Sequence, residues 1–396
     1  MEELVDQALM KAPAVSGAAA TIRAQDALAQ AARSAYWPQL ELNAGLAQTT
    51  SVSPSQTNAT PFSLGTTSLA VRQQIFTFGK VAAAVELADA QAEAARAQAA
   101  LTAAEVAFGV RQSYLAWTQA QGIEAQLAEQ VGFTGATVAE ARARFKAGAA
   151  PRLDVTRAET AIAQARASLA TARATTGQAR RSLAAAIGET SPVAGEPAFP
   201  PVLAIASRPL AELQQAALRH PSLRAQDAEL AQARAASNAA DRAGLPDISG
   251  DASYGIRARD FAGAPNYQFG VSANWPLFTG FNVTHRAEAA HARADAVLQA
   301  RAGVRLAVLR DVDNAHMALD GARQALPAAK AALDAARANL AQARGRYRGG
   351  VGSIIEVADA QSLLATAQAD HVRATAAFHL AIANLQRALG ATGAAK

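Results

Sequence analysis

The chain has 396 residues, of which 51% are hydrophobic, only 5% are aromatic and about 110 are alanine. With 17% charged residues it is too apolar and too weakly charged for a disordered chain, and without cysteine it offers neither disulfides nor thiolate metal ligands. The net charge of +5 comes from arginines spread singly among acidic and amide residues, with no basic block and no interleaved stacking aromatics. We therefore expect solvated helix faces rather than a nucleic-acid partner.

An internal repeat organises the whole sequence. The dipeptide Phe76-Thr77 recurs 202 residues later as Phe278-Thr279, and upstream of it Pro13 recurs 208 residues later as Pro221. At the first spacing further pairs coincide: Phe145 with Tyr347, Gly148 with Gly350, Asp154 with Glu356, and Gly188 with Gly390. The chain is thus a tandem duplication of about 200 residues, in which each half repeats one structural plan.

Each half begins with a helix and continues with two strands. Helices are predicted over about 15–36 and 223–243, and a proline ends each of them, at Pro38 and Pro246. The hydrophobic period then changes from helical to alternating. This change predicts strands of about ten residues, near 40–47, 68–75, 247–257 and 266–277, with a polar loop near 49–61.

A very long helix follows each pair of strands, over about 80–146 and 282–348, and would measure about 100 Å at about 1.5 Å per residue. Such lengths predict coiled-coil-like packing, and Pro327 should kink the second helix locally. Glycines end both helices, and return helices run from near Pro151 to about 187 and from near Ser353 to about 389. Residues 188–209, with five prolines, are predicted to form a non-helical connector.

The strands alternate apolar and polar side chains over a length that crosses a bilayer when tilted. One alternative is a pair of amphipathic hairpins packed on a soluble core. The polar sides carry Asp, Asn, Ser, Arg and Gln, as a watery lumen would, and the helices offer no aromatic-rich face for a sheet to cover. Four strands cannot close a barrel, and open edges are not tolerated in lipid, so the barrel must be shared between chains. Three chains give twelve strands and room for a channel, whereas the eight strands of two chains leave a filled interior.

Several sequence features are missing. No run of about 18 apolar residues predicts a spanning helix, and no signal peptide is visible. The protein is therefore either cytosolic or a processed or trimmed form with an added start Met, and the rest of the sequence favours the second. No phosphate-binding loop, zinc-protease motif or serine nucleophile elbow occurs, and the six histidines lack ligand spacing and are expected at the surface. We expect no enzymatic activity, no cofactor and no metal site.

The order, spacing and duplication of these elements resemble the TolC/OprM family of outer membrane efflux proteins along essentially the whole chain. Three segments carry the resemblance: residues 275–280 (WPLFTG) at a strand-to-helix junction, residues 347–361 (YRGGVGSIIEVADAQ) at a helical-hairpin tip, and their first-half counterpart, residues 145–155 (FKAGAAPRLDV).

The resemblance implies a mainly α-helical, internally duplicated protein. Its long antiparallel helices would form a periplasmic α-barrel, and its four strands would enter a trimeric, twelve-stranded membrane β-barrel. The implied division is strands within 38–78 and 246–280, the helical barrel over 13–37, 79–188, 221–245 and 281–390, and an equatorial connector region of 1–12, 189–220 and 391–396.

The resemblance also implies partners and a function. It implies a homotrimer in the outer membrane, in contact with lipid and extending into the periplasm. The trimer would work with a periplasmic adaptor (membrane fusion) protein and an inner-membrane pump of the RND, ABC or MFS type. Such a protein is a passive duct for drug efflux, metal efflux or type I secretion, and the sequence does not distinguish these cargoes. The alternative from the residues alone is a soluble coiled-coil scaffold.

The hairpin tips are the candidate functional site. The glycines at the tips have two interpretations. An ordinary helix end needs glycine for a sharp reversal, and in the family these tips also meet the adaptor. The resemblance implies adaptor contacts by Gly148, Gly350, Val351, Gly352 and Ser353.

Acidic residues follow each tip and match the family's pore-facing acids: Asp154, Glu356 and Asp359. Glu356 and Asp359 are three residues apart on one helix face, so a trimer would carry two stacked acidic rings that concentrate cations. Acids are also common in first helical turns, where they favour the positive end of the dipole. Tyr347 matches the family's gate tyrosine, with Asp154 as its partner. Gly352 stands where the best-known member has a gate-locking arginine, and Arg348 lies nearby as a candidate substitute.

Overall fold

The computed structural model describes residues 1–51, 60–259 and 262–391, and these form two compact units. One unit, the helical unit, comprises residues 1–19, 98–224 and 303–396. The other, the strand-bearing unit, comprises residues 20–97 and 225–302. Each unit draws on both halves of the sequence, so the duplicated segments fold together rather than as separate domains.

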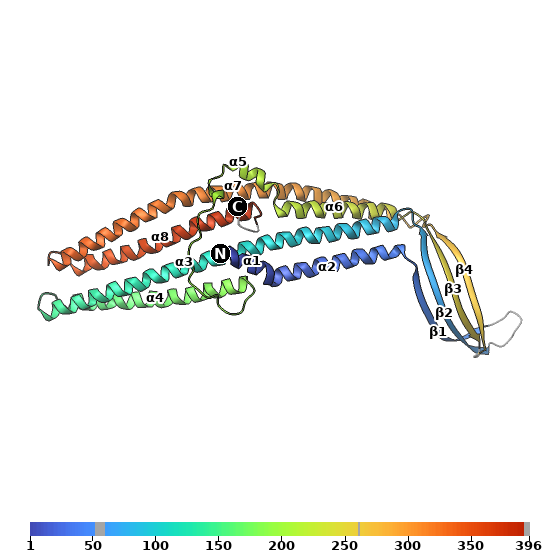
Figure 1. Cartoon of the computed structure of the whole chain (residues 1–396), viewed down its shortest axis with the longest axis horizontal. Coiled ribbons are helices and arrows are strands. Elements are labelled where there is room, and N and C mark those ends of the chain that lie inside the picture. The colour runs from blue at the N-terminus through green and yellow to red at the C-terminus, as the bar shows by residue number, and fades with distance from the viewer. Residues whose placement is uncertain (52–59, 260–261, 392–396) are drawn as a thin grey trace. The chain divides into compact units, whose positions relative to one another are not determined.

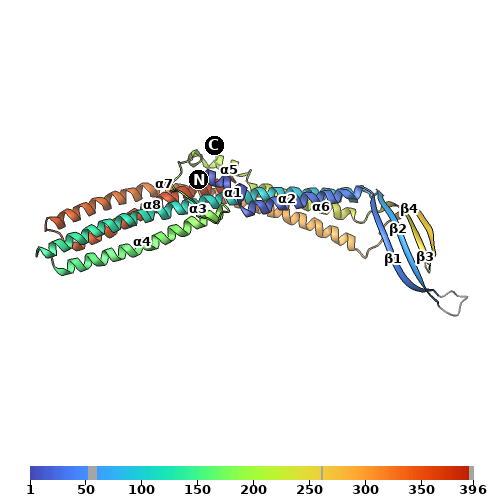
Figure 2. The ribbon, with the colours of Figure 1, turned by 60° about the horizontal axis from the view of Figure 1, so that its bottom comes forward.

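The four longest helices have the bounds that the repeat predicts. Figures 1 and 2 both show them as two side-by-side pairs, α3 with α4 and α7 with α8. Their ranges are α3 Lys80–Lys146, α4 Arg152–Ala186, α7 Asn282–Arg348 and α8 Ile354–Ala388. Pro327 lies inside α7, which continues through it as one helix, and the local kink stays a prediction.

Shorter helices precede the strands of each half. Helices α2 and α6 both begin at a proline, which suits the first helical position because its missing N–H has no partner there. The ranges are α1 Glu2–Lys11, α2 Pro13–Arg33 and α6 Pro221–Arg242, with a 3₁₀ turn η1 at Ser34–Tyr36.

The connector contains more helix than expected. Residues 204–207 form the 3₁₀ turn η2 (Ala204–Ser207), so the prediction of a wholly non-helical segment was wrong there, and α5 (Leu210–Ala217) follows directly. The turn η2 and the helix α5 each bury an apolar side chain, Ile205 and Leu213 respectively, in one core cluster with residues of α7 and α8. This burial stabilises short helices that local propensity alone would leave marginal.

The four strands form one antiparallel sheet in the order β1-β2-β3-β4 (Figure 1). Their lengths of 13, 17, 13 and 13 residues exceed the predicted ten or so, and part of the predicted polar loop lies outside the described residues. The β2–β3 pairing joins the two halves of the duplication. The strands are β1 Gln39–Ser51, β2 Thr60–Phe76, β3 Asp247–Arg259 and β4 Ala262–Asn274.

The register places apolar side chains on one face of the sheet and polar ones on the other. One apolar row, in order across the sheet, is Leu42, Leu69, Tyr254 and Tyr267. The neighbouring polar row is Glu41, Ala70, Ser253 and Gln268. Nothing in the described chain covers the apolar face, where Tyr254 is 63% and Phe269 79% exposed. Such an uncovered face requires either lipid or a partner.

Close packing at the end of each return helix connects distant parts of one half. Gly390 follows α8 with φ +70°, and a Cβ on it would lie 2.1 Å from Pro221 Cδ. Its counterpart Gly188, with φ +80°, packs against the backbone of Lys11 and Ala12. In both halves the glycine after the return helix therefore packs closely against the chain around the start of α2 or α6, but only Gly390 lies against a proline.

No helix among the described residues combines the length and the apolar character needed to cross a membrane.

We predict that Gly390→Ala lowers the free energy of unfolding by about 2–4 kcal/mol, because it adds both left-handed strain and a clash with Pro221. Gly148→Ala is the matched control, since Gly148 has the same φ of +70° with no neighbour within 4 Å of its absent Cβ. Its loss should be about 1 kcal/mol. Thermal or denaturant unfolding of the purified protein measures both, and equal losses would contradict the close contact.

Candidate functional site at the helical tips

The two tips lie in the helical unit, at the turns between α3 and α4 and between α7 and α8. Gly148 and Gly350 have φ of +70° and +76°, as a reversal after a helix requires. The backbone N–H of Ala149 donates to Arg144 O at 2.8 Å, and that of Val351 donates to Arg346 O at 3.1 Å. Both helices thus end in the Schellman manner, with orphan carbonyls satisfied.

The two return helices begin differently. Ser353 caps α8, and its Oγ accepts the backbone N–H of Glu356 at 3.3 Å. This is the Ser-x-x-Glu pattern that marks a helix start. Pro151 stands at the same place before α4 and provides no side-chain cap. The second tip therefore has a more firmly specified turn than the first.

Gly352 is held against the end of α7. A Cβ on it would lie 2.8 Å from Arg346 Cβ and 3.0 Å from Tyr347 N. Its own N–H donates to Arg346 O at 3.0 Å. An arginine at this position would have to displace the last turn of α7. The crowding around Gly352 thus leaves no room for the arginine that the resemblance places at this position.

Tyr347 is buried at the centre of the tip, with only 4% of its surface exposed. The Arg144 guanidinium lies 4.5 Å from its ring centroid and also donates to its backbone carbonyl. The Tyr347 hydroxyl has no hydrogen-bond partner among the described residues. Burial raises the pKa of this hydroxyl, the Asp154 charge raises it further, and the Arg144 cation opposes both.

The predicted pairing of Tyr347 with Asp154 is only partly present. Asp154 is half-buried and close enough to act on the tyrosine electrostatically, yet no hydrogen bond joins the two side chains in the described chain. The basic partner of Tyr347 is instead Arg144, which precedes Phe145, the repeat equivalent of Tyr347. Sequence reasoning missed Arg144 because nothing in the spacing distinguishes it from its neighbours Arg142 and Lys146.

The acidic residues after the second turn are exposed. Glu356 and Asp359 both lie on the surface of α8, but Glu356 Oε2 is 3.2 Å from Arg346 Nε. This ion pair, which the sequence analysis did not anticipate, partly neutralises the negative charge of Glu356. Neither Asp359 nor Asp154 makes an ion pair within the part of the chain that the structure describes.

Contacts between the two hairpins also involve arginines of α7. Arg348 Nε lies 3.7 Å from Glu140 Oε2. Arg348 therefore contacts α3 and does not substitute for an arginine at position 352. The Arg344 guanidinium lies 5.0 Å from the centroid of the Phe133 ring. Burial, followed by the charge of Arg348, lowers the pKa of Arg344. These contacts hold α3 against α7 near the tip.

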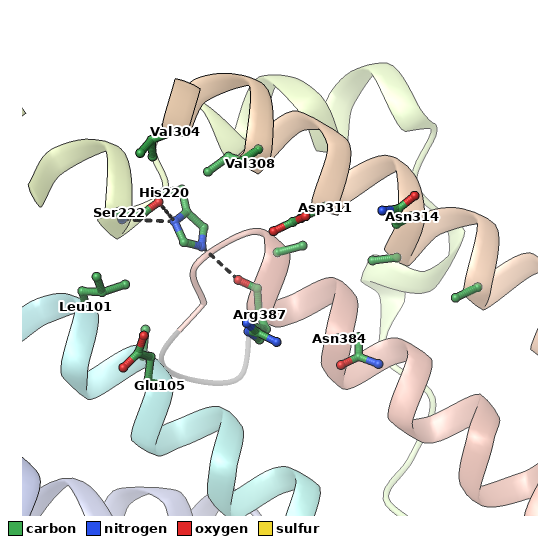
Figure 3. Close-up of a pocket in the computed structure, with 15 residues that line it drawn as sticks. Leu101, Glu105, His220, Ser222, Val304, Val308, Asp311, Asn314, Asn384 and Arg387 are labelled. Atoms are coloured by element: carbon green, nitrogen blue, oxygen red, sulfur yellow. Dashed lines mark hydrogen bonds between the residues drawn. The ribbon is translucent and has the colours of Figure 1, made fainter. Parts of the chain in front are cut away.

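The helical unit also contains a cavity of about 670 Å³, far along the chain from the tips. Figure 3 shows its charged side chains arriving from different helices, Glu105 from α3, Asp311 from α7 and Arg387 from α8. His220 Nε2 lies 3.1 Å from Arg387 O, and Nδ1 lies 2.7 Å from Ser222 Oγ. Burial lowers the pKa of His220, against smaller raising effects of the Arg387 carbonyl and Asp311.

The expectation of six surface histidines was wrong for His379, which is buried on α8. No group of three or more potential metal ligands occurs among the residues that the structure describes.

The duplicated halves, the paired long helices and the two-hairpin sheet define an outer membrane export channel. The chain belongs to the outer membrane efflux protein family, whose model matches residues 4–189 and 213–391. It is 32% identical to protein CyaE of Bordetella pertussis strain Tohama I over 414 residues, which cover 99% of this chain and 84% of that protein. The family and the fold are those of channels rather than enzymes, and the comparisons give no support to a soluble scaffold.

Solved structures agree on the fold. The outer membrane protein VceC of Vibrio cholerae superposes with a TM-score of 0.83 at 22% identity, over 100% of this chain and 96% of that one. The CmeC outer membrane channel of Campylobacter jejuni gives a TM-score of 0.85 at 15% identity, over 99% and 86% of the two chains.

We predict that Tyr347→Phe changes the free energy of unfolding at neutral pH by less than about 1 kcal/mol, because its hydroxyl makes no hydrogen bond that could be lost. Tyr114→Phe is the control, since the Tyr114 hydroxyl bonds both the carbonyl and the N–H of Ala198, at 3.0 and 3.1 Å. That change should cost about 1–3 kcal/mol. A larger loss for Tyr347→Phe than for Tyr114→Phe would show a hydrogen bond to Tyr347 that forms only in the assembled channel.

Stability should also fall in alkali through Tyr347. Its pKa is raised in the folded protein, so the folded state holds this proton more tightly than the unfolded chain does. The contribution is present below the ordinary tyrosine pKa of about 10 and is lost as the pH rises above it. Unfolding measured on both sides of that pH should show a smaller alkaline loss for Tyr347→Phe than for the parent protein.

Proposed function

We propose that three copies of this chain assemble into a passive duct through the outer membrane and the periplasm. The observation that carries the proposal is the sheet, with an uncovered apolar face and with β1 and β4 each paired on only one side among the described strands. In lipid those edges must be paired, and head-to-tail pairing of β4 with the β1 of another copy closes a barrel. Three copies supply twelve strands, enough for an open lumen.

The regions then divide by environment. Residues 38–78 and 246–280 supply the strands of the outer membrane β-barrel. Residues 13–37, 79–188, 221–245 and 281–390 form the periplasmic tube, and residues 1–12, 189–220 and 391–396 form its equatorial belt; of these ranges, residues 52–59, 260–261 and 392–396 lie outside the described residues. The energy for export comes from an inner-membrane pump of the RND, ABC or MFS type, which a periplasmic adaptor connects to the tips. The cargo is selected by the pump rather than by the duct.

The tips combine docking and gating in this proposal. The turn residues that contact the adaptor are Gly148, Gly350, Val351, Gly352 and Ser353. Val351 supports this role because its side chain is largely exposed at the second turn. Behind the turn, Asp154, Tyr347, Glu356 and Asp359 form the pore constriction. In the resting state Arg144 holds Tyr347 and Arg346 holds Glu356, in place of an arginine at position 352.

Electron microscopy of the detergent-purified protein with rotational averaging tests the assembly. We expect a three-fold particle with a detergent belt at one end and helical walls about 100 Å long, as follows from the 67 residues of α3. A monodisperse particle without a belt, or one with two-fold symmetry, would contradict the proposal.

We predict that Glu356→Ala combined with Asp359→Ala lowers the cation selectivity of the channel in planar bilayers several-fold and weakens block by divalent cations. Arg346→Ala should act in the opposite direction, because it frees the Glu356 carboxylate from its ion pair. Arg373→Ala is the charge-matched control, since it breaks a comparable exposed pair with Asp370 elsewhere on α8. Unchanged selectivity in the double variant would disprove the acidic rings and leave the assembly untouched.

A further inference from the structure

A second cavity of the helical unit lies between the connector and two helices, away from the tips. Its volume is about 340 Å³, which is within the usual range for small-molecule sites. Its walls come from four parts of the chain: Met1 and Glu2 at the start, Tyr114 and Leu115 of α3, five connector residues between 198 and 203, and four residues of α8. Those four are His379, Ile382, Ala383 and Gln386.

The connector is firmly fixed over this cavity. The Tyr114 hydroxyl donates to Ala198 O at 3.0 Å and accepts the Ala198 N–H at 3.1 Å. The next residue, Phe199, stacks on the His379 ring at a centroid distance of 5.1 Å and an interplanar angle of 13°. Pro200 and Pro201 follow, with backbone dihedrals restricted by their rings. The cavity therefore exists before any ligand arrives, and a ligand would not have to order its walls.

The walls carry little net charge. His379 is buried and burial lowers its pKa, so its ring is neutral at neutral pH. Glu2 also lines the cavity, but both of its oxygens are bonded to the buried Arg111, at 3.2 and 2.9 Å. Apart from Met1 and the ion-paired Glu2, the lining is aromatic, aliphatic or amide in character, which favours an uncharged ligand.

One polar group on the wall has no partner. Gln386 is 1% exposed, and its Nε2 makes no hydrogen bond among the described residues. A buried amide donor without an acceptor costs about 1–3 kcal/mol, so such groups normally have a reason to be present. The fold itself does not demand this residue. At the repeat spacing of 202, Gln386 corresponds to Ala184 and His379 to Gly177 in the equivalent return helix.

We propose that this cavity binds a planar, uncharged aromatic molecule that bears a carbonyl or similar hydrogen-bond acceptor. The ring contacts the aromatic and proline walls formed by Phe199, Pro200 and Tyr114. The acceptor takes the free N–H of Gln386. Because the ligand touches α3, the connector and α8 together, its binding stabilises their arrangement. The site is separate from the pore constriction and does not depend on the export function.

The natural absence of cysteine allows a direct test by thiol protection. Ala198→Cys places a thiol at the exposed rim of the cavity, and Ala194→Cys places one on the same exposed connector outside it. With 2-naphthamide as the probe, maleimide labelling should slow saturably in the Ala198→Cys protein and stay unchanged in the Ala194→Cys protein. Equal labelling with and without the probe, or equal slowing in both proteins, would overturn the proposal.

The role of Gln386 is tested in the same assay. In the Ala198→Cys background, Gln386→Leu should raise the half-protecting concentration of 2-naphthamide about tenfold, as expected for one lost hydrogen bond. Gln368→Leu, a change at another buried glutamine of α8, should leave that concentration unchanged.

A second probe keeps the test valid if Gln386→Leu does not fold. Naphthalene lacks the acceptor, so it should protect the Ala198→Cys protein about tenfold more weakly than 2-naphthamide does. Equal protection by the two probes would overturn the assignment of Gln386 as the donor.

Discussion

Backbone hydrogen bonding at the two edges of the sheet is the constraint on which the rest of this protein depends. Among the described strands, β1 and β4 are each paired on one side, and no described residue covers the apolar row that includes Leu42 and Tyr267. Water could hydrogen-bond to the backbone of the edge strands but would leave the apolar face exposed to it. Lipid could cover the apolar face but offers no hydrogen bonds to the edge strands. The proposed assembly with further copies of the chain would satisfy both, because the edge strands would pair with neighbouring copies while the apolar face meets lipid.

The helices meet this demand with small side chains rather than large ones. Alanine supplies many of the buried positions, and the larger members of the core clusters are mostly Leu, Val and Ile. Small residues allow helix backbones to approach closely and leave little bulk to obstruct a lumen. At the tip, the large side chains of Tyr347 and Arg144 contact each other across the two hairpins.

Duplication gave the two halves the same helix lengths but not the same chemistry. The second tip has a capping serine, a buried tyrosine and a crowded Gly352, where the first has Pro151, Phe145 and Ala150. The second return helix carries His379 and Gln386, where the first carries Gly177 and Ala184. In the proposed duct, the shared lengths would serve a common tube, and the differing side chains would take separate roles at the tips and at the connector.

The sequence alone determined the architecture of each half. Hydrophobic period, glycines and prolines predicted α3 and α7 at their observed bounds, because helix ends depend on local chemistry that each segment carries within itself. Alternation predicted which strand residues share a face. The tertiary structure decided what depends on distant partners: the β2–β3 pairing, the Arg346–Glu356 ion pair, Arg144 over Tyr347, and the burial of His379. Those contacts arise between side chains that periodicity treats as equivalent to their neighbours, so only the packing of one helix on another distinguishes them.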